Sequence, residues 1–478
     1  MKKIIVLFTM LVLLVGYITP SFAMTDEQAT AIQALLEEAC KKSGVPGMSV
    51  SIVVEDEVLY FSSGYADREK GIKSDENTLY ELASVSKAFT GLGILLLEEQ
   101  GLLSMDDPVQ KYLPWLTLKY QGKAVDMSKY TLNQFLHHTS GLVNGKHTLL
   151  IPRGDSEDML KKTIEIIVDV ELAFPVGERY QYGTVNYDVL GLVIEVVSAQ
   201  RYEEYMKTQV FEPLGLNNTY LYKEEALANG QVAKGYRTYF FQTFLYDAPM
   251  FGGNKPAGYI MSSTKDMARW LGIQMGTVKD IPEGFFKVIE RSHQGNTTVE
   301  DVEGMYYAAG WEVNEDRSIV EHSGGNPNFA TRAMTWPNEK IAICLLTNGE
   351  HTNIDIAVQI KEIIAGNLQQ SYKFNVTQTM DIVLSSICLV FLLLTAVAFW
   401  LGVKRRKANR ERVKSLKRTV FMVFWILLAI ASCSMLFMTQ ILFSGSLADV
   451  LVWFTYSTLG VVITFVLFSA AMTWYVSG

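Results

Sequence analysis

The sequence predicts an α/β fold in which a sheet domain carries an all-α subdomain, followed by a membrane-embedded tail. Strand patterns at both ends of the first 370 residues enclose a long helical stretch, as expected of such a domain. About the last hundred residues are strongly apolar, as membrane-spanning helices are. A chain of 478 residues is also too long for one ordinary core, so several structural units are expected.

The globular part is predicted to span residues 24–370. It opens with helical spacing of apolar residues over Thr25–Lys42, and Met48–Val54 and Val58–Ser63 have the pattern of two hairpin strands. The pattern turns helical beyond residue 84 and becomes mixed near residue 260. Four later segments look like successive strands: Gly310–Val313, Ser318–His322, Ala330–Trp336 and Ile341–Thr347. A functional site is expected in the cleft between the sheet domain and the helical subdomain.

The N-terminus has the three parts of an export signal. Met1-Lys2-Lys3 is basic, Ile4–Ile18 is apolar, and Ser21-Phe22-Ala23 is a small-x-small cleavage site. Residues 1–23 are therefore predicted to be a signal peptide, with Met24 as the mature start. An uncleaved N-terminal anchor is the alternative, and either way the chain is exported.

Three apolar segments of the tail are each long enough to cross a bilayer: residues 382–403, 420–443 and 450–474. A span needs about 20 residues to cross a core of about 30 Å. The loop 404–419 contains Lys404-Arg405-Arg406-Lys407 and further basic residues. Such a loop could bind nucleic acid, but between two spans it indicates the cytoplasmic side. The sequence thus predicts a multi-pass protein of the cell membrane with an extracytoplasmic globular domain. The expected partners are the lipid bilayer and, to explain three spans, a membrane protein.

Composition narrows the function further. The net charge of −8 implies no broad basic surface, so no nucleic-acid partner is expected. Outside the apolar spans only Cys40 and Cys344 are present; they could form a disulfide, but two buried free thiols are the preferred interpretation. No Cys/His cluster has the spacing of metal ligands, so neither a metal nor another cofactor is expected.

A candidate nucleophile begins the long helical stretch. Ser84-Val85-Ser86-Lys87 is a Ser-x-x-Lys segment, and residues three apart share one face of a helix, about 5–6 Å apart at the Cβ atoms. A serine hydroxyl attacks only when a neighbouring base takes its proton, and a lysine is that base only if burial or another cation lowers its pKa. The helix N-terminus adds free N–H groups for an oxyanion. Alone, the segment is weak evidence, because many such tetrapeptides only start solvated helices.

Further segments make the pattern specific. Together with Ser84–Lys87 they form a series of motifs in a fixed order along residues 30–365. They are Leu132 with Phe135–Leu142, Pro175–Tyr187 with Leu190-Gly191, Pro213–Leu216, Ala257–Tyr259 with Ser262–Met267, and His322–Gly325. Together they resemble the motifs of the serine β-lactamase and penicillin-binding protein superfamily, in its class C β-lactamase-like branch. The resemblance implies a β-lactamase/transpeptidase-like α+β fold, an antiparallel sheet plus an all-α subdomain.

The resemblance also implies catalytic roles. Ser84 would form the acyl-enzyme, Lys87 would assist its deprotonation, and Tyr182 would act with Lys87 as general base and later as acid. Alternatively Tyr182 is a packed aromatic with a satisfied hydroxyl. Ser86 is interpreted as a packing residue, and His137-His138, in a segment that supports the helical subdomain, as structural.

The third motif, His322-Ser323-Gly324-Gly325, is expected on the strand that edges the cleft. His322, Ser323 and Gly324 would contact substrate, and the backbone N–H groups of Gly325 and of the nucleophile would form the oxyanion hole. The alternative is a strand-end histidine without function. Many members have a lysine at the position of His322. Since histidine has a pKa near ~6.5, activity is expected to change between about pH 5.5 and 7.5.

The second motif departs from the family pattern at Thr184, where an asparagine is usual. A threonine hydroxyl offers fewer hydrogen bonds than a carboxamide, which weakens the expectation of amide-substrate recognition. Asn186 is expected at a turn position, from which it cannot replace the missing carboxamide.

The predicted function is that of a membrane-anchored, extracytoplasmic serine hydrolase with an acyl-serine intermediate. Its expected substrates are small or peptidoglycan-type molecules, namely D-alanyl peptides, D-alanyl esters or other carboxylic esters. A β-lactamase is the second enzyme hypothesis. A non-catalytic receptor for penicillin or wall fragments is the alternative from another class, suggested by Thr184 and the multi-span tail.

Overall fold

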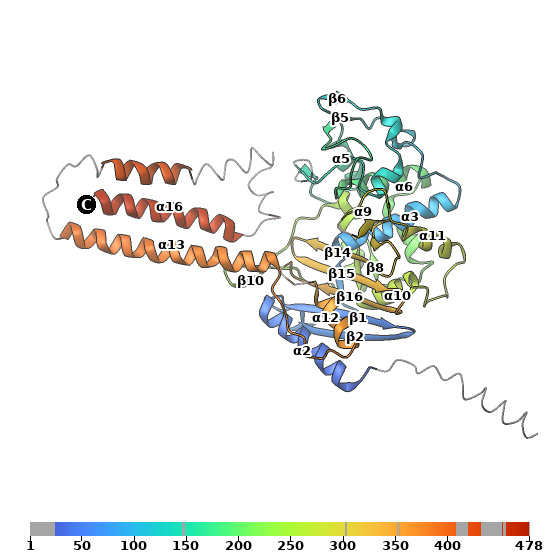
Figure 1. Ribbon diagram of the computed structural model, residues 1–478, viewed down its shortest axis with the longest axis horizontal. Coiled ribbons are helices and arrows are strands. Elements are labelled where there is room, and N and C mark those ends of the chain that lie inside the picture. The colour runs from blue at the N-terminus through green and yellow to red at the C-terminus, as the bar shows by residue number, and fades with distance from the viewer. Residues whose placement is uncertain are drawn as a thin grey trace, which may run out of the picture.

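A computed structural model of the chain describes residues 24–145, 148, 150–301, 304–350, 352, 354–407, 419–431, 452 and 456–477. The predicted signal peptide, residues 1–23, lies outside these residues. The described chain forms a globular domain from which apolar helices extend to one side (Figure 1).

An eight-stranded antiparallel sheet is the frame of the domain, with the order β12-β13-β14-β15-β16-β1-β2-β3. Its strands are β1 Gly47–Val54, β2 Glu57–Asp67, β3 Ile72–Lys73, β12 Met305–Tyr307, β13 Glu312–Asn314, β14 Val320–Asn326, β15 Phe329–Trp336 and β16 Ile341–Thr347. The first strand pairs with the last, with Ser51 opposite Cys344. Every residue of β1 and β16 is buried, because both faces of the sheet are covered.

Two helices cover one face of this sheet, α2 Asp26–Ser43 and α12 Ile356–Ile364 (Figure 1). Thr25 and Gln28 form a capping box that fixes the start of α2. The buried apolar side chains of both helices form one core with alternate residues of β1 and β16. The predicted first helix is thus present, shifted by one residue, and the predicted hairpin is present with strands that begin one residue earlier and with a longer second strand.

The helical subdomain packs on the opposite face. Its helices are α3 Ser86–Glu99, α4 Leu132–Leu136, α5 Met159–Glu165, α6 Val185–Ser198, α7 Tyr202–Met206, α8 Lys223–Asn229, α9 Lys255–Gly258, α10 Thr264–Gln274 and α11 Gly284–Ser292. Helix α3 is apolar on all sides because it runs through the centre of this layer. Its Phe89 stacks on Trp270 of α10 at 4.0 Å between ring centroids.

The subdomain is not all-α, and that part of the sequence prediction is wrong. Two small sheets lie among the helices: β4 Leu79–Glu81 with β8 Thr219–Tyr220 and β11 Met261–Ser263, and β5 Leu118–Tyr120 with β6 Lys123–Ala124 and β7 Val170–Glu171. A third small sheet, β9 Tyr236–Tyr239 with β10 Gln242–Leu245, lies instead beside Gly44 and Tyr456. Segments of two to four residues are too short to show a two-residue period, so the sequence pattern gave no sign of them.

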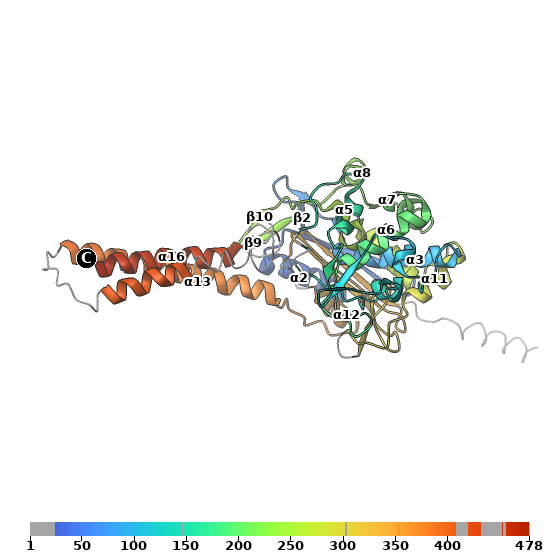
Figure 2. The ribbon, with the colours of Figure 1, turned by 90° about the horizontal axis from the view of Figure 1, so that it is seen from above.

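Two tail helices, α13 Val376–Lys407 and α16 Tyr456–Ser477, are long and apolar enough to cross a membrane. They lie side by side and point away from the domain (Figure 2). A third apolar helix, Thr419–Ala431, is shorter. Residues 432–443 of the predicted second span, the loop 444–449, and residues 450, 451 and 453–455 of the predicted third span lie outside the described residues. Of the basic loop 404–419, only residues 404–407 and 419 are described. The described residues therefore show two candidate spans, and the arrangement of three spans stays a prediction.

Both cysteines of the globular domain are free thiols, as the preferred interpretation predicted. Cys344 is buried in β16, whereas Cys40 is only half-buried. The expectation that both are buried is wrong for Cys40, which lies on the rim of α2 near the carbonyl of Ser63.

Candidate active site

Ser84 lies in a short 3-10 turn, Ala83–Val85, directly before α3. Neighbouring strands hold this turn from two sides: the Leu82 N–H donates to the Ile260 carbonyl at 2.8 Å, and the Thr331 hydroxyl donates to the Leu82 carbonyl at 2.8 Å. Ala83 has a positive φ of 47°, which is unfavourable for a residue with a Cβ. The turn is thus held in an uncommon conformation that presents Ser84 ahead of the helix.

Lys87 lies one turn later on α3, with its side chain completely buried. Its Nζ donates to Ser84 Oγ at 3.1 Å, to Thr184 Oγ1 at 3.3 Å and to the Ala257 carbonyl at 2.7 Å. Burial lowers the pKa of Lys87 to about 7, and the nearby carboxyl of Asp188 opposes this shift. A large fraction of the amine is therefore neutral at neutral pH.

Tyr182 approaches the same serine from the segment before α6. Its hydroxyl donates to Ser84 Oγ at 2.8 Å, and its ring centroid lies 4.9 Å from Lys87 Nζ. Burial raises the pKa of the Tyr182 phenol well above its usual value. The phenol is neutral across the physiological range, so its hydroxyl is a proton donor in the resting site.

Thr184 contacts Lys87 through its hydroxyl, and its own N–H donates to Asn144 Oδ1 at 2.9 Å. The lysine contact usually supplied by a carboxamide is therefore made by this threonine. Asn186 is not at a turn, contrary to the sequence expectation: it lies in the first turn of α6. It is fully buried, and its carboxamide bonds Ser140 Oγ at 2.6 Å and the Gly183 carbonyl at 2.8 Å, so it does not reach the cleft.

His322 is buried on β14, with Nε2 3.0 Å from the hydroxyl of Tyr307 and Nδ1 2.6 Å from the Ser323 carbonyl. Because the carbonyl can only accept, Nδ1 carries the proton and Nε2 accepts from Tyr307. Burial lowers the pKa of His322 to about 3, and the positive charge of Lys87 adds to this effect. The expected titration of His322 between about pH 5.5 and 7.5 is therefore wrong, since burial keeps the ring neutral.

The other residues of the third motif shape the cleft with backbone. A Cβ at Gly324 would collide with the Leu82 carbonyl, so a glycine allows β14 to approach the turn that bears the nucleophile. Gly325 is exposed and lines the cavity over Ser84. Strand alternation places Ser323 on the same face as Gly325.

The cavity in front of Ser84 has a volume of about 320 Å³. Its lining residues are Ser84, Asn144, Thr148, Ile151, Tyr182, Thr184, Asn254, Ala257, Gly258, Gly325 and Asn326. None of these described residues carries a charged side chain. The predicted residues Ser84, Tyr182, Thr184 and Gly325 are thus brought together, whereas His322, Ser323 and Gly324 are not part of this lining.

Asp188 is a residue of the site that the sequence analysis missed. It lies one turn after Thr184 on α6, fully buried, and accepts a hydrogen bond from Asn254 Nδ2 at 2.6 Å. Burial raises the pKa of Asp188, and the hydrogen bond from Asn254 and the charge of Lys87 partly offset this shift. Asp188 is the carboxylate nearest the second motif in the mostly apolar run Val185–Ser198, which also contains Glu195, and its place there was the signal that could have found it.

Three further residues have the structural roles that the sequence analysis preferred. Ser86 is buried, and its Oγ accepts the Ile260 N–H at 3.1 Å. His137 bonds the Tyr307 carbonyl at 2.8 Å through Nδ1. His138 packs its ring 4.5 Å from that of Tyr182 and positions the segment before α6. Ser86 contacts Ser84 through its backbone N–H, which donates to the Ser84 carbonyl, and no side-chain contact of these three with Ser84 is found among the described residues.

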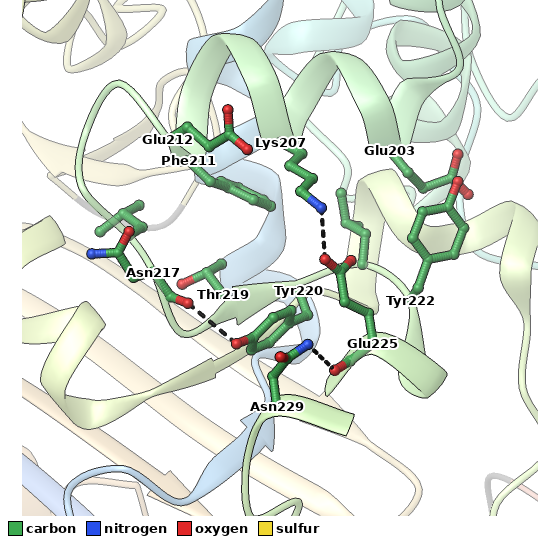
Figure 3. A pocket seen from close by; sticks show the side chains of 12 residues that line it. Glu203, Lys207, Phe211, Glu212, Asn217, Thr219, Tyr220, Tyr222, Glu225 and Asn229 are labelled. Carbon is green, nitrogen blue, oxygen red and sulfur yellow. Dashed lines mark hydrogen bonds and ion pairs between the residues drawn. The ribbon is translucent and has the colours of Figure 1, made fainter. Parts of the chain in front are cut away.

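A second hollow of about 250 Å³ lies beside α7 and α8 (Figure 3). It shares no lining residue with the cavity at Ser84. Lys207 and Glu225 form an ion pair across it at 2.6 Å, and Tyr220 donates to the Asn217 carbonyl at 3.2 Å (Figure 3). Its described lining contains no serine beside a lysine like the pair Ser84 and Lys87, so the chemistry is assigned to the cavity at Ser84.

Comparison with known proteins agrees with this geometry. A family model described as beta-lactamase matches residues 32–365. The chain is similar to protein flp of Staphylococcus aureus strain MRSA252, with 28% identity over 88% of this chain and 84% of the relative. It is also similar to penicillin-binding protein 4* of Bacillus subtilis strain 168, with 26% identity over 68% of this chain and 73% of the relative. Among solved structures, the octameric penicillin-binding protein homologue from Pyrococcus abyssi is 28% identical, with a TM-score of 0.62 over 73% of this chain and 79% of that one.

The antiparallel sheet, the helical layer and the cleft between them define a β-lactamase/transpeptidase-like α+β fold. Within that class, the chain belongs to the beta-lactamase family, in the superfamily of serine β-lactamases and penicillin-binding proteins. The resemblance inferred from the sequence motifs is confirmed.

Proposed function

We propose that the chain is a membrane-anchored, extracytoplasmic serine hydrolase that acts through an acyl-serine intermediate on D-alanyl peptides or esters of the cell envelope. Membership of the family supports a serine hydrolase with peptidoglycan-like substrates. The observation that carries the proposal is the pair of contacts on Ser84 Oγ, from Lys87 Nζ at 3.1 Å and from Tyr182 Oη at 2.8 Å. A base and a proton donor at these distances are what an acylating serine needs.

In the proposed acylation, Ser84 Oγ forms a bond to the substrate carbonyl carbon while its proton passes to the neutral amine of Lys87. A pKa of about 7 suits this step, because the amine is then a base without being permanently protonated. The neutral Tyr182 phenol donates a proton to the departing alcohol or amine, and the protonated Lys87 restores it. Water then attacks the acyl-serine, releases the carboxylic acid and regenerates the Ser84 hydroxyl.

The tetrahedral oxyanion is assigned to the backbone N–H groups of Ser84 and Gly325. Two observations support this assignment: both residues line the cavity, and the space beside Gly325 is open, with no atom within 4 Å of a Cβ built there. Backbone donors that are already in place stabilise developing charge without reorganisation.

The part of the cavity lining that the structure describes favours neutral esters over peptides with a free C-terminal carboxylate. These residues include no cation, and His322, which stands where many relatives have lysine, is neutral because burial lowers its pKa to about 3. An ester substrate also makes fewer amide hydrogen bonds with the enzyme, which is consistent with Thr184 in the place of the usual asparagine. Asn144 and Asn254 line the cavity, each with one carboxamide atom engaged by Thr184 or Asp188, and the other carboxamide atom of each is assigned to orienting the acyl group.

Membrane anchoring is supported by α13 and α16, whose length and apolar composition suit a membrane. Most of their large side chains are exposed, as expected of surfaces that face lipid. The basic residues Lys404–Lys407 at the end of α13 favour a cytoplasmic location for that end, which leaves the domain outside.

A fluorescent penicillin tests the nucleophile. The full-length protein in detergent is incubated with the probe, and covalent adducts are mapped by mass spectrometry. We expect an adduct on wild type and on Ser86→Ala, and none on Ser84→Ala; the buried Ser86, two residues away, is the matched control. An adduct that persists in Ser84→Ala contradicts the assignment. A stable adduct would favour the penicillin-binding type, and rapid turnover the β-lactamase alternative.

Substrate class is tested with two compounds that share one D-alanyl acyl group, a neutral ester and a peptide ending in a free D-alanine carboxylate. We expect a higher kcat/KM for the ester. A clear preference for the free carboxylate would contradict the argument from the uncharged cavity. An adduct with penicillin but no turnover of either compound would instead favour the receptor hypothesis.

A further inference from the structure

The β9–β10 hairpin has an unusual tip. Phe240 and Phe241 form the tip and are exposed by 38% and 52%; Phe244 and Leu245, which pair with Arg237 and Tyr236 further from the tip, are exposed by 42% and 52%. Loop tips are normally polar, and exposed large apolar side chains gathered on one hairpin indicate an interaction site.

The backbone of the turn indicates that Phe240 and Phe241 do not stabilise the hairpin. Phe240 and Phe241 both have positive φ, 51° and 62°, in a two-residue connection between β9 and β10. Such a turn is formed best by Asn-Gly, because bulky L-residues are unfavourable at positive φ. An outlier of this kind that also exposes apolar surface points to a contact made by the side chains.

The hairpin is packed against one of the two tail helices. The Tyr239 ring lies 4.9 Å from that of Tyr456, the first residue of α16, and the Arg237 guanidinium lies 5.5 Å from the same ring. The Phe240 ring is so close to Gly460 that a Cβ there would come within 2.6 Å of it. Figures 1 and 2 show the hairpin at the domain end of the two helices. Contacts with residues 456–460 therefore set its position along α16.

The contacts between α13 and α16 mark the two ends of the apolar stretch. At the domain end, Ser457 donates to Asp381 at 2.6 Å, directly before the apolar run that begins at Ile382. At the far end, Arg406 donates to Ser477 at 2.8 Å, so the two helices run parallel. Gly460 lies three residues beyond Ser457, about 4.5 Å further toward the far end at the rise of an α-helix. The Phe240 ring that touches Gly460 is thus level with the start of the apolar stretch.

We propose that the tip of the β9–β10 hairpin is an additional membrane contact, in which Phe240 and Phe241, supported by Phe244 and Leu245, insert into the interfacial layer of the lipid bilayer. The inference rests on the proposed membrane anchoring by α13 and α16. Aromatic side chains favour this layer, where apolar surface is buried beside polar headgroups. The hairpin would then fix the orientation of the catalytic domain, so that the cleft at Ser84 is held at one height above the membrane.

An environment-sensitive fluorophore tests the proposal in the full-length chain, reconstituted in phosphatidylcholine–phosphatidylglycerol nanodiscs with its four native cysteines replaced. The fluorophore NBD is attached at Phe241→Cys and, as control, at Leu102→Cys. Leu102 is an exposed apolar residue of similar exposure, 54%, at the end of α3. We expect a blue-shifted emission at position 241, with quenching by lipids that carry a nitroxide on the acyl chain, and neither effect at position 102. Equal emission at both positions overturns the proposal. A blue shift without acyl-chain quenching also overturns it, because protein then covers the tip.

A second variant separates insertion from folding of the hairpin. Phe240→Asn with Phe241→Gly suits the positive φ angles and removes both rings. With NBD at Phe244→Cys, we expect the double variant to lose most of the acyl-chain quenching, while turnover of a soluble ester is unchanged. Undiminished quenching overturns the role of the two rings. Flotation of the wild-type chain with liposomes reports anchoring separately: a chain that does not float refutes the proposed anchoring, whereas a floating chain without quenching at position 241 refutes the hairpin contact alone.

Discussion

Acidification should switch off the reaction through Lys87. The lysine is completely buried, and burial lowers its pKa to about 7, with the carboxyl of Asp188 opposing the shift. The amine must be neutral to take the proton of Ser84, so activity is present above the pKa and is lost as the pH falls through it. A group of pKa about 7 is about 90% neutral at pH 8, about 10% at pH 6 and about 1% at pH 5.

The assay is kcat/KM for a soluble neutral ester between pH 5 and 9, with the full-length protein in detergent. We expect a plateau above about pH 8 and a tenfold loss per pH unit below about pH 6. The His322→Asn variant is the control, since a histidine would titrate in a similar range. Because burial lowers the pKa of His322 to about 3, the acid limb, which is the fall of kcat/KM at low pH, should keep its midpoint in that variant even if the plateau value is lower.

Two results would refute this reasoning. A profile that is flat from pH 5 to pH 8 would show that no base with a pKa near 7 takes part. An acid limb that disappears in His322→Asn would transfer the titration from Lys87 to the histidine. A rate that still rises tenfold per pH unit between pH 8 and pH 9 would instead indicate the phenolate of Tyr182 as the base, because burial raises the pKa of that phenol.

Three further predictions concern residues around the nucleophile. Tyr182→Phe removes the hydroxyl that donates to the nucleophile at 2.8 Å, and kcat/KM should fall by about 10²–10⁴ while the acid limb stays; a variant that keeps half of the wild-type activity would exclude Tyr182 from proton transfer. Asp188→Asn removes a carboxyl that raises the pKa of Lys87, so the acid limb should move to lower pH, and a limb that stays or rises would show that this carboxyl does not act on the lysine. Gly310→Ala places a Cβ against the backbone of Lys87 and should lower the free energy of unfolding by about 2 kcal/mol or more in chemical denaturation. Gly276→Ala, at a similar φ of 72° but in open space, is its control, and an equal loss in both would mean that only the φ penalty counts.

Most of the fold could be predicted where periodic patterns are long. The strands β1, β15 and β16 and the helix α2 were found within a few residues, because seven or more residues establish a period of two or 3.6. The small sheets of the helical subdomain were missed, because strands of two to four residues have no readable period. Their pairing depends on segments far apart in the chain, such as β4 and β11.

In the candidate site, too, local features could be predicted from the sequence, whereas features that depend on packing could not. The contact between Ser84 and Lys87 follows from a spacing of three residues on one helix, which is local geometry. The position of Asp188 behind that lysine depends on how α6 packs against α3, and no motif indicates it. The protonation of His322 was predicted wrongly, because a reference pKa assumes contact with water.

By itself, the sequence determined the family and the apolar character of the tail, and it predicted Ser84 as nucleophile and Lys87 as its base, since each is written in a motif or in composition. Only the tertiary structure decided the electrostatics of the cleft and the position of the aromatic hairpin. Desolvation of Lys87 and His322 and the contact of Phe240 with Gly460 arise from segments that meet only after folding. Burial is a property of the packed chain, and burial sets which of these groups carries a charge.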